Sequence, residues 1–154
     1  MSTVVWNYCD FARLTPLGIY NILALRQRVF IVEQNCAFQD ADGHDLSANH
    51  LLGQRDGRLL AYARVLPPGV KYAEHSIGRL VVDPSARNAG LGRTAMREAI
   101  RRIAAASGPA PIRLQAQEYL ADTLYKPLGF ERISAVYHED GIPHVDMRLA
   151  AAGL

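Results

Sequence analysis

Long apolar runs, a basic leader and a cysteine framework are all missing from this sequence of 154 residues. No stretch approaches the roughly 20 apolar residues of a membrane-spanning helix, so we expect no membrane partner. The first residues, MSTVVWNYCDFARL, lack the basic start and apolar core of a secretion signal. The two cysteines, Cys9 and Cys36, form neither a close pair nor a metal-ligand spacing. We therefore expect free thiols, no bound metal and a cytoplasmic protein.

The sequence also lacks a large excess of charge of either sign, because its 17 basic and 15 acidic residues leave a formal net charge of only +2. Lys and Arg form no evident stripe, and the densest basic spot, Arg101 with Arg102, is typical of a solvated helix face. We therefore expect no nucleic-acid partner. About half of the residues are apolar, and the chain has no internal repeat or low-complexity segment. Length and composition predict one domain over residues 1–154.

The first half of the chain predicts a strand, a helix and a hairpin. Thr15 followed by Pro16 is a helix-start signal, and a helix is expected over residues 16–30. Apolar residues at core spacing in this helix are Ile22, Leu25 and Val29. Two strand-like runs meet at Asp56-Gly57, which is a strong hairpin signal. The expected strands cover residues 4–12, 50–54 and 58–66.

Residues 39–45, QDADGHD, are acidic and rich in turn-forming types. Their spacing does not fit a calcium loop, which needs a third oxygen ligand before the glycine and a distant glutamate. A solvated loop is therefore the expectation. The same residues could attract a cationic amine, although any exposed turn carries residues of this kind.

The second half of the chain alternates strands and helices. Residues 76–83 form an expected strand that is apolar on both faces, which is typical of a central position in a sheet. A helix is expected from Gly90 to about Ala106, with one apolar face. The other expected elements are a short helix at 119–128 and strands at 112–117, 130–137 and 144–149. This order predicts an α/β fold whose mixed, mostly antiparallel sheet is flanked by helices.

Two glycines stand at the start of the second expected helix, in the stretch VDPSARNAGLGR at residues 82–93. A helix start offers unpaired backbone N–H groups and partial positive charge, and together these bind anions. Gly90 and Gly92 would let a phosphate approach the backbone, and Arg87 and Arg93 could add charge. The pattern fits neither a P-loop nor a dinucleotide-binding fingerprint. A tight turn with close helix packing is the structural alternative.

The pattern Val82-Asp83-Pro84-x-x-Arg87-x-x-Gly90-x-Gly92 resembles the acyl-coenzyme A signature of the GNAT N-acetyltransferase superfamily. The stretch at 121–130, with its Tyr125, resembles the family's A-x-x-x-Y-x-x-L-G-F segment. Three further stretches are similar to the ElaA-type branch of small bacterial acetyltransferases: LRQRVFIVEQ at 25–34, AYARVLPPG at 61–69 and YHEDGIPHVDM at 137–147. In one departure, Glu118 stands where the family often has an asparagine that contacts the coenzyme.

The resemblance implies two splayed central strands, with the pantetheine arm of acetyl-coenzyme A in the gap beside Leu80, Val81 and Val82. It implies that the pyrophosphate is held by a loop made of Arg87, Asn88, Ala89, Gly90, Leu91, Gly92 and Arg93. It also implies that Tyr125 is the general acid for the leaving thiolate, and a backbone N–H near Val81 or Val82 could stabilise the thioester oxygen. A core tyrosine bonded to backbone is the alternative for Tyr125.

The attacking amine must lose a proton to a base. Glu33 is the first candidate, because segment 25–34 should line the acceptor side; a surface carboxylate at a helix end is the alternative. Weaker candidates for the base are Glu74 and His75. For His144, on an expected strand beside Pro143, we expect a structural histidine bonded to backbone, with the base role as the alternative. Gln115 and Gln117 could contact the acceptor or pantetheine, or they could face solvent.

The expected function is acetyl-CoA-dependent transfer of an acetyl group to a primary amine of a small molecule or peptide. The amine would attack directly in a ternary complex, without a cysteine nucleophile. A non-catalytic acyl-CoA-binding sensor or partner protein is the alternative, and transfer to an oxygen acceptor is a third interpretation. The resemblance also allows a homodimer.

Overall fold

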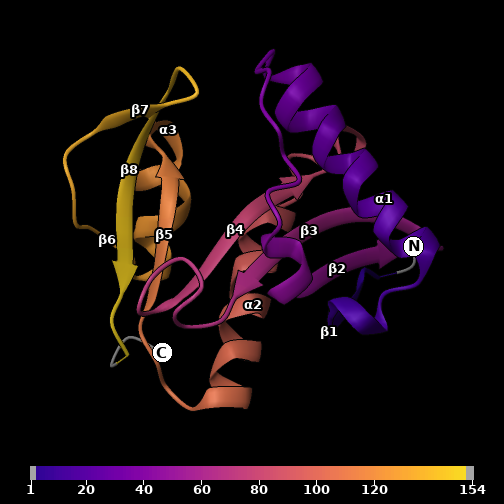
Figure 1. The fold of residues 1–154 in the computed structure, drawn as a ribbon, viewed down its shortest axis with the longest axis horizontal. Helices are drawn as coiled ribbons and strands as arrows, with labels where there is room; N and C mark the ends of the chain where they lie inside the picture. Colours follow the sequence, from indigo (N-terminus) through magenta and orange to yellow (C-terminus); the bar gives the residue numbers. More distant parts are fainter. Residues whose placement is uncertain (1–2, 152–154) are drawn as a thin grey trace.

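A computed structural model describes residues 3–151, and an antiparallel meander makes up the first half of its sheet (Figure 1). Strands β1 (Val5–Asp10), β2 (Asn49–Arg55), β3 (Arg58–Leu66) and β4 (His75–Val82) pair in that order. The β2–β3 hairpin turns at Asp56 and Gly57, and both have positive φ. This hairpin confirms the turn that the sequence predicts.

Helix α2 (Leu91–Ser107) carries the chain from β4 to the second half of the sheet. There β5 (Ile112–Gln117) pairs in parallel with β4, and β8 (Ile142–Leu149) pairs antiparallel with β5. The sheet has the order β1-β2-β3-β4-β5-β8-β6, and β7 also pairs with β8. The predicted fold class, a mixed and mostly antiparallel sheet with flanking helices, is therefore confirmed.

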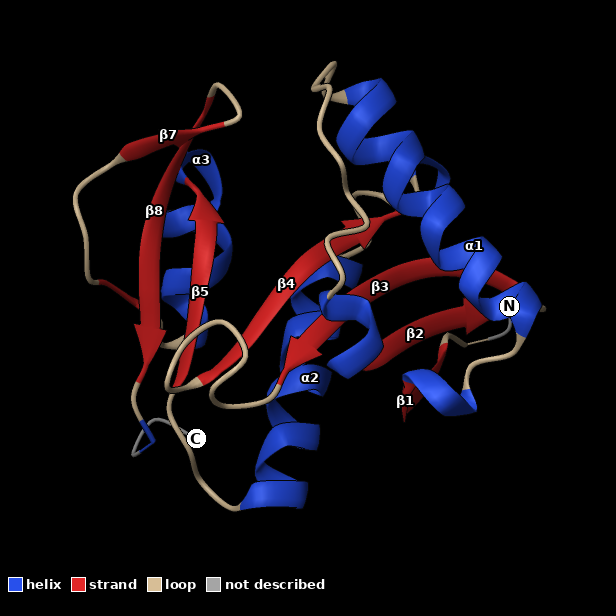
Figure 2. Cartoon of the chain, in the orientation of Figure 1, coloured by secondary structure: helices blue, strands red, loops and turns tan. Residues whose placement is uncertain are grey.

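The two central strands separate soon after they meet. β4 and β5 pair only at His75 with Ile112 and at Ser76 with Arg113. Beyond these pairs the strands diverge, which Figure 2 shows as a widening gap between β4 and β5. The divergence confirms the splayed central strands, and it leaves one edge of β4 without a strand partner from Ile77 to Val82.

Helices cover the two faces of the sheet. Thr15 caps α1 (Pro16–Arg26) by accepting a hydrogen bond from Gly18 N at 2.9 Å. One face carries a buried cluster of Ile22, Leu25, Val29, Leu52, Leu59, Tyr62 and Val81. On the other face, the buried residues of α2 are Ala95, Met96, Ala99 and Ile103, and they pack with the larger cluster that contains Leu51, Val65, Ile77 and Leu114.

Two helical segments differ from the prediction. α1 continues as a π-helix over Gln27–Glu33, so the helical run ends three residues later than residue 30. The expected helix at 119–128 consists of α3 (Glu118–Leu120), a π-helical turn over Ala121–Tyr125 and a 3₁₀ turn over Lys126–Leu128. Other 3₁₀ turns cover Phe11–Arg13, His44–Ser47 and Pro84–Ala86. π-Helical turns are rare and often occur at functional sites, and here both lie beside the same pocket.

The predicted strand at 130–137 is wrong as a single element. The structure has two short strands, β6 (Glu131–Arg132) and β7 (Tyr137–Glu139), which both pair with β8. Between them the Ser134 hydroxyl accepts the Asp146 backbone N–H at 2.9 Å. The Ser134 hydroxyl thus replaces a backbone carbonyl as the acceptor of the Asp146 N–H, and this interrupts the pattern of backbone hydrogen bonds between the strands.

No helix within residues 3–151 combines the length and the apolar character that a membrane span requires.

Candidate functional site

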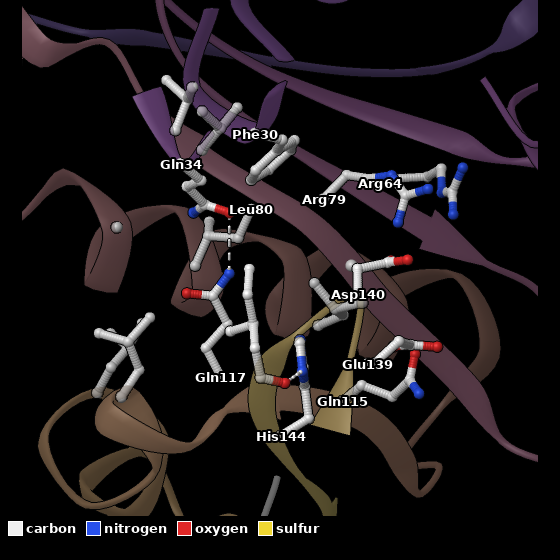
Figure 3. A pocket seen from close by; sticks show the side chains of 18 of the residues that line it. Phe30, Gln34, Arg64, Arg79, Leu80, Gln115, Gln117, Glu139, Asp140 and His144 are labelled. Carbon is white, nitrogen blue, oxygen red and sulfur yellow. Dashed lines mark hydrogen bonds between the residues drawn. The ribbon is translucent and has the colours of Figure 1, made fainter. Parts of the chain in front are cut away.

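A pocket of about 440 Å³ opens where β4 and β5 diverge (Figure 3). β4 contributes Leu80, Val81 and Val82 to its wall, and β5 contributes Gln115 and Gln117. Its volume lies within the range of small-molecule sites in proteins. Several predicted site residues line this one cavity: Glu33, Leu80, Val81, Val82, Arg87, Gly92 and Tyr125.

The loop before α2 leaves backbone donors free at the helix start. Gly90 is the cap residue, with φ of +75°, and no side chain caps the helix. The first intrahelical bond runs from Thr94 N to Gly90 O at 3.0 Å. The N–H groups of Leu91, Gly92 and Arg93 therefore have no acceptor within the helix, which favours an anion at this end.

Close packing does not explain the second glycine of this loop. A Cβ built on Gly92 would meet its nearest neighbour, Val82 Cγ2, at 3.8 Å, which is ordinary van der Waals contact. A glycine in a helix costs about 0.5–1 kcal/mol relative to alanine. Asn88 and Ala89 are exposed, whereas Arg87 and Gly92 line the pocket. The space beside Gly92 fits a group from outside the chain, such as a pyrophosphate.

Arg87 and Glu33 form a two-point ion pair across the pocket mouth. Arg87 Nη1 lies 2.5 Å from Glu33 Oε1, and Nη2 lies 2.9 Å from Oε2. The hydrogen bonds from Arg87 hold the pKa of the Glu33 carboxyl below its usual range. An anion that binds Arg87 must therefore compete with Glu33. Arg93 makes a different contact, because its Nη2 donates to Thr123 O at 3.0 Å in the neighbouring π-helical turn.

β4 carries a bulge inside the pocket. The register with β3 shifts between Tyr62 and Arg64, and Arg79 has φ of +50°. A non-glycine residue in the left-handed region is unusual and costs free energy, and such residues cluster at functional sites. Because bulges change the direction of side chains, we connect this one with the placement of Arg79 in the pocket lining.

Tyr125 lies at the end of the second π-helical turn and lines the same pocket. Its ring packs edge-on against Phe130, with centroids 6.0 Å apart. Its hydroxyl makes no hydrogen bond to any residue in the described part of the chain. A tyrosine hydroxyl is protonated at neutral pH at its usual pKa near 10, and burial raises the pKa of Tyr125 further. This is the protonation state that a general acid needs.

The acidic loop is solvated only in part: Gln39 and residues 41–43 are exposed, whereas Asp40 is buried. The Asp40 Oδ2 accepts from Arg26 Nε at 2.7 Å. Arg26 also donates to Asp45 at 2.7 Å, and Arg64 donates to Asp42 at 2.8 Å and 2.9 Å. The carboxylates pair with arginines from α1 and β3, so their charge is neutralised inside the protein. The loop therefore offers little free negative charge to attract an amine.

Arg64 and Arg79 line one wall of the pocket, and Figure 3 shows their guanidinium groups together there. They belong to an ion-pair network whose other members are Arg26, Asp40, Asp42 and Asp45. Behind this wall, His50 Nε2 donates to Asp45 O at 2.9 Å, and Tyr62 OH donates to Nδ1 at 2.7 Å. Burial lowers the pKa of His50, which is consistent with this neutral tautomer. Sequence reasoning missed this wall, because its partners are far apart in the chain.

Polar side chains of β5 and β8 form the opposite wall. Gln117 Nε2 donates to Gln34 Oε1 at 3.4 Å, which links β5 to the first π-helical segment across the gap (Figure 3). Gln115 Nε2 donates to Tyr137 OH at 2.9 Å, and Tyr137 OH donates to Asp146. His144 lines the pocket, and its Nδ1 donates to Ile142 O at 2.7 Å.

The remaining candidate residues lie elsewhere. Glu74 and His75 are not part of the pocket lining, and Glu74 accepts from Arg148 at 3.0 Å. Glu118 is 3.5 Å from Arg132 and does not line the pocket either. We therefore set Glu74 and His75 aside as candidates for the base.

The diverging central strands, the helix start with free backbone N–H groups and the buried tyrosine are the features expected of an acyl-coenzyme A-dependent transferase. The family model of the GNAT acetyltransferase domain matches residues 29–151, so the chain belongs to the GNAT family. The protein is thus an acyltransferase, and members of this family use an acyl-CoA and an amine acceptor.

Within the family, the chain is similar to ElaA and the UPF0039 proteins. It is 42% identical over 151 residues to a UPF0039 protein of Schizosaccharomyces pombe, and the aligned region covers 97% of this chain and 99% of that protein. It is 36% identical over 146 residues to Escherichia coli ElaA, covering 94% and 95% of the two chains. A crystal structure of an acyl-CoA N-acyltransferase from Pseudomonas aeruginosa matches with a TM-score of 0.92 and 40% identity, covering 96% and 100%.

Proposed function

We propose that this protein transfers an acetyl group from acetyl-CoA to a primary amine of a small molecule or peptide. The observation that carries this proposal is the single pocket that joins three parts of a reaction site. It is lined by Gly92 at the open start of α2, by the unpaired edge of β4 and by Tyr125. A coenzyme laid along this pocket has its anionic end at Arg87 and its thioester end near Tyr125.

The described residues fit the coenzyme at both ends. Backbone N–H groups of Leu91, Gly92 and Arg93 would hold the pyrophosphate, with Arg87 adding charge. The rest of the predicted loop, Asn88, Ala89 and Gly90, supplies the turn. Leu80, Val81 and Val82 present backbone groups to the gap, where pantetheine would take the place of the missing strand partner. The bound acyl-CoA supplies a thioester that an amine can attack.

Direct attack in a ternary complex needs three contributions from this chain. A backbone N–H near Val81 or Val82 would stabilise the negative charge on the thioester oxygen. Tyr125 would give its proton to the leaving sulfur, because a tyrosine hydroxyl is protonated at neutral pH. Glu33 would accept the proton of the amine only after its side chain moves, because in this structure it lies on Arg87, at the end of the pocket assigned to the pyrophosphate. Because Glu33 is paired with Arg87, we expect it to become available when the pyrophosphate takes its place on Arg87.

A thiol-release assay with a panel of amines, amino acids, polyamines and peptides tests the function. Wild-type protein should release coenzyme A only when an accepted amine is present, and mass spectrometry should find an amide product. Tyr125→Phe should bind acetyl-CoA normally and lose about 10²–10⁴-fold in kcat, the range of general acid catalysis. Equal turnover by this variant would remove Tyr125 from the acid role. An ester product would instead indicate an oxygen acceptor.

Three broader proposals go with this function. Residues 1–154 would act as one domain, and the family allows a homodimer. A reducing compartment such as the cytoplasm is consistent with Cys9 and Cys36, which are both free.

A further inference from the structure

Lysine is rare in this protein, and one of its lysines lines the reaction pocket. Among the 17 Lys and Arg residues of the sequence, only Lys71 and Lys126 are lysines. An arginine guanidinium stays protonated and is no acyl acceptor near neutral pH, whereas a lysine amine can lose its proton. Lys71 lines the same pocket as Leu80 and Tyr125. Lys126 is exposed and lines a different hollow.

The ammonium of Lys71 is held at the acceptor end of the pocket. Lys71 lies in the segment between β3 and β4, and its Nζ donates to Gln115 Oε1 at 2.5 Å. Gln115 precedes Gln117 by two residues on β5, which corresponds to roughly 6.6 Å along a strand. Gln117 borders the gap in which the thioester is expected (Figure 3). The flexible four-carbon stem of a lysine lets Nζ take other positions in the pocket that Lys71 and Gln117 both line.

Charged groups from several elements surround the Lys71 amine. Glu139 of β7, Arg79 of β4, Arg64 of β3 and Asp42 all act on it, and the Tyr72 ring lies 5.5 Å from Nζ. Lys71 is exposed as a whole, but desolvation of its ammonium lowers its pKa, and Arg79 and Arg64 act in the same direction. Glu139 and Asp42 oppose this shift. The net lowering increases the neutral, nucleophilic fraction of the amine at a given pH.

We propose that Lys71 is an internal acyl acceptor, so that the protein acetylates its own pocket when no better amine is present. The proposal rests on the acyl-CoA site described above. The Nζ lone pair forms a bond to the thioester carbonyl carbon, the C–S bond breaks, and its electron pair leaves on sulfur. Tyr125 protonates that sulfur and regains a proton from solvent, while the amine proton passes to solvent. The products are Nε-acetyl-Lys71 and free coenzyme A.

Acetylation of Lys71 changes the acceptor end in two ways. It removes the positive charge that faces Glu139, and it adds an acetyl group beside Gln115. Both changes reduce the room and alter the charge available to an external amine. The modified protein is therefore expected to be a slower transferase, which would make the reaction self-limiting when acyl-CoA is plentiful and acceptor is scarce.

Peptide mapping by mass spectrometry tests the proposal, with Lys126 as an internal control. The full chain is incubated with acetyl-CoA alone and sampled over time. Folded protein should acetylate Lys71 at least about tenfold faster than Lys126, a ratio that corresponds to ~1.4 kcal/mol of activation free energy. The Lys71 rate should rise with pH and fall in Tyr125→Phe. Urea-unfolded protein should lose the preference, and Lys126→Arg should leave the Lys71 rate unchanged.

Coenzyme A calorimetry and thiol release with the amine panel run in parallel on wild-type protein. If the protein binds the coenzyme and acetylates an external amine, yet Lys71 is unmodified or no faster than Lys126, the internal acceptor is refuted and the proposed function stands. If the protein neither binds the coenzyme nor releases thiol, both proposals are refuted.

Discussion

Replacing Gly92 with alanine should change the stability of α2 and the affinity of its N-terminus for an anion in opposite directions. Gly92 is in the first turn of α2, and the nearest atom to an added Cβ would be Val82 Cγ2 at 3.8 Å. The protein therefore has room for the methyl group. Alanine is a better helix former than glycine by about 0.5–1 kcal/mol, so Gly92→Ala should raise the free energy of unfolding by up to about 1 kcal/mol. A bound pyrophosphate would need the same space.

The expected result of Gly92→Ala is a protein that is more stable and binds coenzyme A more weakly. Affinity should fall by about tenfold or more, which corresponds to ~1.4 kcal/mol. Calorimetric titration with coenzyme A measures the affinity, and urea unfolding measures the stability. Ala105→Gly makes the reverse exchange at an exposed position near the other end of α2. This control should lose about 1 kcal/mol of stability and keep its affinity. Unchanged or tighter binding by Gly92→Ala would refute the placement of the pyrophosphate.

Three other perturbations probe the charged groups. Glu33→Gln removes the group that competes with an anion for Arg87; because an exposed ion pair is worth about 0.2–1 kcal/mol, calorimetry should show up to about fivefold tighter binding of coenzyme A, while kcat falls. The control is Glu98→Gln, which removes a carboxylate that pairs with Arg101 and Arg102. Weaker binding of coenzyme A by Glu33→Gln would contradict the competition. Arg26→Met removes one of the two arginine partners of Asp40 and of Asp45, leaving Arg79 and Arg64, and should cost about 3–5 kcal/mol in urea unfolding because Arg26 and Asp40 are buried. The exposed Arg101→Met should change stability little, and a similar loss in both would contradict the role of the network. Burial alone would raise the pKa values of Asp42 and Asp45, but hydrogen bonds and charge from Arg64 and Arg26 outweigh it and lower both. Their contribution to stability should thus be complete above about pH 5 and lost as pH falls below about 3.9, the usual pKa of aspartate, so a flat urea midpoint between pH 6 and 3 would contradict it.

Local signals predicted most of the fold. The Thr15 cap, the Asp56-Gly57 turn and the alternation of Ile112, Leu114 and Ala116 are each decided by residues close in the sequence, and the structure confirms them. The order of these elements was enough to predict the mixed sheet. Element boundaries failed where backbone hydrogen bonds depart from the regular pattern, as in the two π-helical turns and at Ser134.

The arginine–aspartate network and Lys71 could not be predicted in the same way. Asp40 pairs with Arg26 and lies against Arg79, which is 39 positions away in the chain. An acidic turn with distant arginine partners has the same composition as a solvated one, so composition alone cannot distinguish them. Lys71 carries no motif, and only the fold brings it to Gln115. The glycine loop at residues 87–93 is a local signal, because its residues are consecutive in the sequence.

The short pairing between β4 and β5 also has a mechanical consequence. The two halves of the sheet share two residue pairs at one end and are apart at the other. A ligand that bonds to β4 on one side and to β5 on the other links the two halves of the sheet. Its binding free energy then stabilises the folded protein against separation of the two halves and against unfolding of either one. Resistance to proteolysis and heat should accordingly rise with the concentration of such a ligand.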